Sequence, residues 1–290
     1  MTKRRLFTGL TLIILGILVF IIGFIAMRNT DMSQYNTKRE RIDSFEEYDA
    51  GGVENITLDL GVSNYSIVFS GSAEKITVDS KGVFKDLTRA EVDGNDFSYR
   101  LNDSSVINIG KINIHMFDLN FERLADIHSL SDFADIINDK ADESKVTITL
   151  PDKEYNNIKI NAGVGNVDIS GADGDEIKLS AGVGNVTLTD ISGKTTKISA
   201  GAGNIRGTDL DLGDFNLSAG VGNVDLSGKT NDTKISCGVG NVTMHIQGAR
   251  SDYDIDEDDA EIHGSGSGSG DRNYDLKISS GLGDCDIYFE

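Results

Sequence analysis

The chain has 290 residues, with 27 Lys and Arg against 47 Asp and Glu, so its formal net charge is −20. This charge argues against nucleic-acid binding, because affinity for phosphates needs a basic surface. The 33 Gly occur with a single Pro, which is the composition neither of collagen nor of a typical disordered chain. Two Cys exclude a disulfide scaffold and a four-thiolate metal site.

Residues 1–28 are expected to form a cytoplasmic tip and a transmembrane signal-anchor helix. The run from Leu6 to Met27 carries no charge, and at ~1.5 Å per residue it spans ~33 Å as a helix, enough to cross a bilayer. A cleaved signal peptide is the alternative, but it would have a shorter apolar core and an Ala-x-Ala site. The basic residues at positions 3–5 favour a cytoplasmic N-terminus. We therefore expect a single-pass protein of the cell membrane with an extracytoplasmic C-terminal domain.

The polar residues 29–52 are interpreted as a stalk above the membrane. Residues 53–157 hold several alternating segments and are interpreted as an irregular β region, in which 60–65 resemble a decayed copy of the later repeat. Within it, apolar residues recur at threes and fours over 117–139, which predicts a short helical insertion. This insertion would either cap the domain or present a partner surface.

A repeat dominates residues 158–290. The string Ala-Gly-Val-Gly-Asn-Val-Asp-Ile-Ser recurs with spacings of 19, 19, 19 and 18 residues, and 43 residues separate the fifth copy from a looser sixth. The copies begin at Ala162, Ala181, Ala200, Ala219, Cys237 and Ser280. The flanks alternate apolar and polar residues, as strands with one buried face do. Because two short strands cannot bury that face alone, the sequence predicts an all-β, repetitive β-solenoid with a period of about 19 residues.

The 43-residue gap has room for two repeats, or for one repeat and an insertion. It contains an acidic run followed by alternating Gly and Ser, and residues 251–270 are interpreted as a solvated loop. The acidic run lacks the Gly and Glu of an EF-hand loop.

Each copy has a Gly-x-Gly-Asn corner between its two strands. Gly permits the sharp turn, and stacked Asn amides can bond from repeat to repeat, so we interpret these columns as structural, with a ligand role as the alternative. A calcium-binding glycine-rich repeat would need a carboxylate where this chain has Val or Ile, and no metal or cofactor is expected. The corner residues are Gly163, Gly165, Asn166, Gly182, Gly184, Asn185, Gly201, Gly203, Asn204, Gly220, Gly222, Asn223, Gly238, Gly240 and Asn241.

A lysine column is the other periodic feature. If the repeats stack ~4.8 Å apart, these ammonium groups form a ladder on one face. The ladder is either a solubilising edge that blocks aggregation or a stripe that binds an anionic envelope polymer or lipid headgroups. Its members are Lys159, Lys178, Lys197, Lys234 and Lys277, with Asn216 as the exception.

No catalytic constellation emerges. The four His residues lack metal-site spacing, and there is no nucleophile elbow or phosphate-binding loop. Cys237 and Cys285 occupy apolar repeat positions and are interpreted as small buried hydrophobes. A polysaccharide-active β-helix enzyme is kept as the least favoured alternative, since such enzymes line a groove with acids.

The G-V-G-N-V-[DT]-[IL] repeats, preceded by K-[IL]-S-A, resemble the bacterial "putative adhesin" domain family of unknown function, including LiaG-like membrane-anchored proteins of cell-envelope stress operons. The resemblance covers 53–290 and is most specific in 158–245. It implies a membrane-tethered β-solenoid with an adhesive or stress-linked binding role and no established catalysis. We therefore expect a non-enzymatic binding module, whose partner is an anionic envelope polymer or another membrane protein. The alternative is an accessory protein that regulates a membrane signalling partner.

Overall fold

The computed structural model describes residues 41–84, 88–101, 106–109, 112–115, 144–258, 260–264 and 273–290. The expected transmembrane segment 6–27, residues 29–40 of the polar stalk and the expected helical insertion at 117–139 lie outside these residues. Within them, no helix has the length and apolarity needed to cross a membrane. All the described strands belong to one compact unit, Glu40–Phe117 with Ala134–Glu290, and this unit is described by itself.

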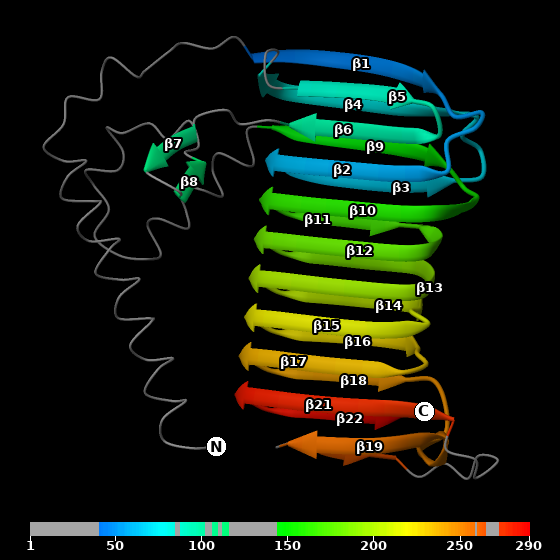
Figure 1. Cartoon of the computed structure of the whole chain (residues 1–290), viewed down its shortest axis with the longest axis vertical. Coiled ribbons are helices and arrows are strands. Elements are labelled where there is room, and N and C mark those ends of the chain that lie inside the picture. Colours follow the sequence, from blue (N-terminus) through cyan, green and yellow to red (C-terminus); the bar gives the residue numbers. More distant parts are fainter. Residues whose placement is uncertain are drawn as a thin grey trace, which may run out of the picture. The chain divides into compact units, whose positions relative to one another are not determined.

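The all-β prediction is confirmed: the described residues form strands and one three-residue 3₁₀ turn, Arg250–Asp252. The strands lie in two rows, here called face A and face B (Figure 1). In order of pairing, face A contains β5 (Thr88–Asp93), β6 (Asp96–Leu101), β2 (Asn55–Val62), β10 (Glu154–Val164), β12 (Asp173–Val183), the second half of β13 (Val186–Ala202), β15 (Asp214–Val221), β17 (Thr233–Val239), β21 (Tyr274–Leu282) and β19 (Tyr253–Asp258).

Face B has the matching order. It contains β1 (Arg41–Asp49), β4 (Lys75–Phe84), β9 (Lys145–Pro151), β3 (Asn64–Ser70), β11 (Val167–Ser170), the first half of β13, β14 (Ile205–Asp211), β16 (Val224–Lys229), β18 (Val242–Ile246), β22 (Cys285–Phe289) and β20 (Glu261–His263). A separate antiparallel hairpin joins β7 (Val106–Ile109) and β8 (Ile112–His115).

The repeats pair in parallel with a register equal to their spacing in the sequence. Ile158 on β10 is the partner of Ile177 on β12, and Val167 on β11 is the partner of Val186 on β13. Equivalent side chains therefore line up in columns along each face. The corner at 60–65 pairs directly with the first regular repeat, through β2 with β10 and β3 with β11.

The stacking order departs from the chain order at the C-terminal end. Strands β21 and β22 pair with β17 and β18, whereas β19 and β20, which come earlier in the chain, pair on the outer side of β21 and β22. The 43-residue gap therefore contains one further pair of strands, placed beyond the sixth copy. The interpretation of 251–270 as a loop is wrong for Tyr253–Asp258 and Glu261–His263.

The opposite end is antiparallel. Strand β1 pairs with β4 and β4 with β9 on face B, while β5 pairs with β6 on face A. Residues 41–49, interpreted from their polarity as part of the stalk, are therefore an edge strand. Charged side chains on an edge strand discourage further strand pairing, which explains why this strand has the composition of a linker.

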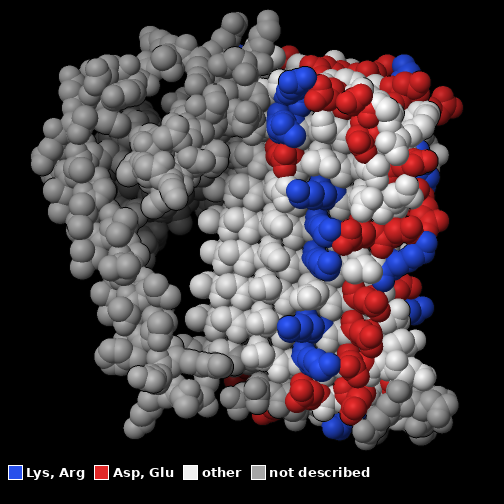
Figure 2. All heavy atoms as spheres, viewed as in Figure 1, with Lys and Arg blue, Asp and Glu red and all other residues white. Residues whose placement is uncertain are grey.

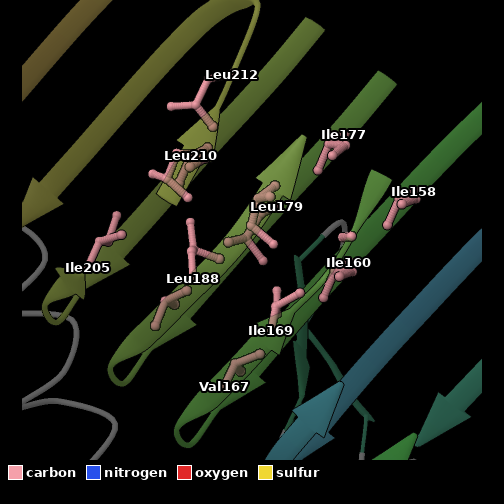
Figure 3. Packing of buried hydrophobic residues seen from close by; sticks show 14 of the residues in the cluster. Ile158, Ile160, Val167, Ile169, Ile177, Leu179, Leu188, Ile205, Leu210 and Leu212 are labelled. Carbon is pink, nitrogen blue, oxygen red and sulfur yellow. The ribbon is translucent and has the colours of Figure 1, made fainter. Parts of the chain in front are cut away.

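The core lies between the two faces. Side chains of both rows alternate, and those that point inward meet, such as Ile160 and Leu179 with Ile169 and Leu188 (Figure 3). An apolar cavity among these repeats measures about 10 Å³, no more than a single water needs. This cavity is therefore too small to hold a ligand.

Candidate binding surface

The Gly-x-Gly-Asn corner turns the chain from face A to face B. Its second glycine has a positive φ in every copy, for example +137° at Gly203, a conformation that side chains disfavour. A Cβ on the first glycine would meet backbone of the previous repeat: at Gly201 it would lie 2.6 Å from the carbonyl oxygen of Gly182. Both glycines are thus required by backbone geometry.

The Asn column bonds from repeat to repeat. The side-chain Oδ1 of Asn185 accepts from the backbone N–H and the Nδ2 of Asn204, at 3.3 and 3.1 Å. Asn166 Oδ1 likewise accepts from the backbone N–H and the Nδ2 of Asn185. The backbone N–H of Asn223 donates to Asn204 Oδ1. These side-chain amides therefore form hydrogen bonds between neighbouring repeats, as the structural interpretation of the column expects.

The five lysines lie on adjacent strands of face A at one register position. Lys159 pairs with Lys178, Lys178 with Lys197, and Lys234 with Lys277, while Asn216 interrupts the series. We call this set the lysine column.

Acidic residues flank the lysine column on one side. Lys178 Nζ lies 2.8 Å from Glu176, Lys197 lies 3.4 Å from the same carboxylate, and Lys277 lies 2.9 Å from Asp275. The hydrogen bond from Lys178, helped by Lys197 and opposed by partial desolvation, lowers the pKa of Glu176. These pairs are largely exposed, and exposed ion pairs contribute little stability, about 0–1 kcal/mol, so an external anion can compete for the lysines.

A serine column flanks the lysines on the other side. Each repeat has Ser two residues after the lysine position, and these serines are exposed and share one register. They are Ser180, Ser199, Ser218, Ser236 and Ser279, and Asn161 takes the place in the first copy. Figure 2 shows basic atoms in a line on this face, with acidic atoms on one side and uncharged residues on the other. The serine column was not predicted from the sequence, although the K-x-S spacing already places Lys and Ser on one outer face.

An apolar column runs beside the corner. The residue between the two corner glycines is exposed at Val183 (48%), Val221 (55%), Val239 (47%) and Leu282 (66%). Each is the partner of its equivalent in the next repeat, with Ala202 between Val183 and Val221. The flanking glycine columns add no side chains, so the uncharged strip consists of Ser hydroxyls, bare backbone and small apolar groups.

These features define an all-β protein of stacked parallel repeats, in which equivalent side chains form columns on the surface. The chain belongs to the Toastrack DUF4097 family, whose model matches residues 53–289.

Solved structures with similarity to the chain include a "putative cell adhesion protein" from Clostridium sporogenes, at 17% identity and a TM-score of 0.34, covering 87% of this chain and 100% of that one. A "putative adhesin" from Bacteroides fragilis matches at 13% identity and a TM-score of 0.38, covering 86% of this chain and 98% of that one. The comparison with curated proteins finds no match.

Proposed function

We propose that this chain is a non-enzymatic, adhesin-like binding module of the bacterial cell envelope, built as a β-solenoid that binds an anionic polymer along face A. The observation that carries the proposal is the lysine column beside the serine column. The two columns run side by side at the ~4.8 Å spacing of paired strands, with Asn216 in place of Lys and Asn161 in place of Ser. A periodic surface of this kind suits a linear ligand with repeating charge.

The asymmetry of charge favours one path for such a ligand. The acidic residues Glu176, Asp214 and Asp275 repel an anion from one side of the lysine column. On the other side, the exposed serine hydroxyl groups offer hydrogen bonds without negative charge. A chain of phosphates or carboxylates would therefore lie over the serines, with the ammonium groups along one edge.

The uncharged segment 6–27 supports the proposed location. As a membrane-spanning helix it would tether the module to the cell membrane with residues 29–290 outside, where wall polymers are within reach. A role in envelope stress is part of the same proposal and derives from the resemblance to LiaG-like proteins.

The exposed apolar column favours a second candidate. A contiguous apolar surface is typical of protein interfaces, so the chain would instead act as an accessory that contacts a membrane signalling protein. Replacing Val221 and Val239 with Ser would weaken that contact and leave polymer binding unchanged.

The polymer proposal is tested by co-sedimentation of the purified full-length chain with poly(glycerol phosphate)-bearing cell wall. We expect the triple variant Lys178→Gln, Lys197→Gln, Lys234→Gln to lose most of its binding. The matched control removes three exposed lysines outside the column, through Lys81→Gln, Lys145→Gln and Lys229→Gln. Equal binding by the two triple variants would contradict a role for the lysine column, because their net charges are the same.

A further inference from the structure

The last strands of face B bring together a histidine and two carboxylates. The lysine column lies on the other face, face A. Glu261 on β20 is the register partner of Asp286 on β22, and His263 on β20 is the partner of Tyr288. One ligand atom from each of Glu261, His263 and Asp286 lies within 4.8 Å of the others. The His263 Nε2 is 3.5 Å from Asp286 Oδ1 and 3.8 Å from Glu261 Oε2.

The imidazole of His263 is held in orientation by the ring of Tyr288. Its ring lies 4.6 Å from that of Tyr288 at an interplanar angle of 14°, and His245 stacks on Tyr288 at 4.8 Å and 12°. Because β22 lies between β18 and β20, the two histidines cover opposite faces of the tyrosine. The contact with Tyr288 thus holds the His263 ring with Nε2 toward the two carboxylates, while His245 does not touch His263.

The surroundings of this cluster differ from the regular repeats. A surface hollow of about 540 Å³ is lined by Ala260, Glu261, Asp284, Cys285 and Asp286. Asp284 occupies the corner position that is Asn in the five earlier copies, so a third carboxylate faces the same hollow. Two of these acids are register partners, an arrangement that repels unless a cation lies between them.

We propose that Glu261, His263 and Asp286 form a divalent metal site at the terminal repeat, which takes Zn²⁺ or a similar first-row transition ion. Imidazole nitrogen with carboxylate oxygen is the donor set of such ions, whereas Ca²⁺ prefers six to eight oxygens. Tetrahedral zinc with bonds of ~2.1 Å needs its ligands about 3.4 Å apart. The Glu261 side chain is 81% exposed, so it can rotate to bring its carboxylate closer to the other two ligands. The fourth position stays open to water or to an external anion, with Asp284 nearby.

Isothermal titration of the tag-free full-length chain with ZnCl₂ tests the proposal, with CaCl₂ as the comparison. We expect one zinc per chain, at least tenfold weaker binding in His263→Gln and in Asp286→Asn, and much weaker binding of calcium. The control is His245→Gln, which removes a histidine on the face of Tyr288 opposite His263. Among the described residues, the only ion-pair partner of His245 is Glu290, at 2.6 Å, so His245 contacts none of the three proposed ligands. This variant is expected to bind zinc like the wild type.

Thermal unfolding gives a second readout, since an ion bound only by the folded state raises the melting temperature. Zinc should raise it in the wild type and in His245→Gln, and leave both site variants unchanged. The absence of stoichiometric zinc binding would overturn the proposal. Equal zinc affinity in His263→Gln, or calcium binding as tight as zinc binding, would show that the carboxylates attract cations without a histidine-containing site.

Discussion

Gly203→Ala should destabilise the stack more than any single change at an unconstrained glycine. Gly203 has a φ of +137°, and its added Cβ would overlap the carbonyl group of Gly184 in the previous repeat. A residue other than Gly in such a conformation costs about 1–3 kcal/mol, and overpacking costs about 1–3 kcal/mol more. The sum, about 2–6 kcal/mol, lowers the melting temperature by roughly 4–24 °C at about 2–4 °C per kcal/mol.

Two controls separate these contributions. Gly52 has a φ of +127°, but its Cβ would meet nothing within 4 Å, so Gly52→Ala reports backbone strain alone. Gly201 does not have a positive φ, but its Cβ would lie 2.6 Å from the Gly182 oxygen, so Gly201→Ala reports crowding alone. Thermal unfolding followed by circular dichroism measures all three. If Gly203→Ala costs no more than Gly52→Ala, then the close contact between repeats at the corner is not as described.

Three further outcomes are expected. Asn204→Ala removes the amide that bonds to both neighbouring repeats and should cost about 1 kcal/mol in chemical denaturation, while the same change at the unstacked Asn231 side chain should cost less. The lowered pKa of Glu176 contributes stability that is present above pH 4.5, the ordinary pKa, and is lost as pH falls through the lowered pKa. Lys178→Gln should raise the pKa of Glu176 again, as measured in a carboxyl NMR titration. Burial raises the pKa of the Cys237 thiol to about 11, so a thiol reagent at pH 7 should label it only after unfolding, and rapid labelling of the folded chain would contradict its burial.

The regular repeats could be predicted from the sequence because each strand and its register are determined by short patterns within and between neighbouring repeats. Alternation sets which side chains point inward, and the 19-residue spacing sets the register, as the pairing of Lys178 with Lys197 illustrates. The role of the corner glycines could also be predicted, since only Gly tolerates the φ of Gly203 without strain. The exposure of Val221 could not be predicted, because alternation alone does not describe a strand end next to a glycine of positive φ.

The order of stacking could not be predicted. Each repeat offers nearly the same edges, so the sequence does not determine that β19 and β20 lie beyond β21 and β22. The cluster of Glu261, His263 and Asp286 depends on this exchange, and neither spacing nor composition indicates it. Strand β1 was missed for a different reason: its Phe45 is exposed and its acidic residues resemble a linker.

The most direct test of the proposed function is the salt dependence of binding. Full-length protein would be titrated onto immobilised poly(glycerol phosphate) from low to high ionic strength, beside the lysine-column triple variant and its matched control. We predict that affinity of the wild type and of the control falls steeply with salt, because released counterions drive the contact, and that the triple variant has little affinity at any salt concentration. Binding that is absent in the wild type, or that is insensitive to both salt and the three lysines, would contradict a polymer-binding surface on face A.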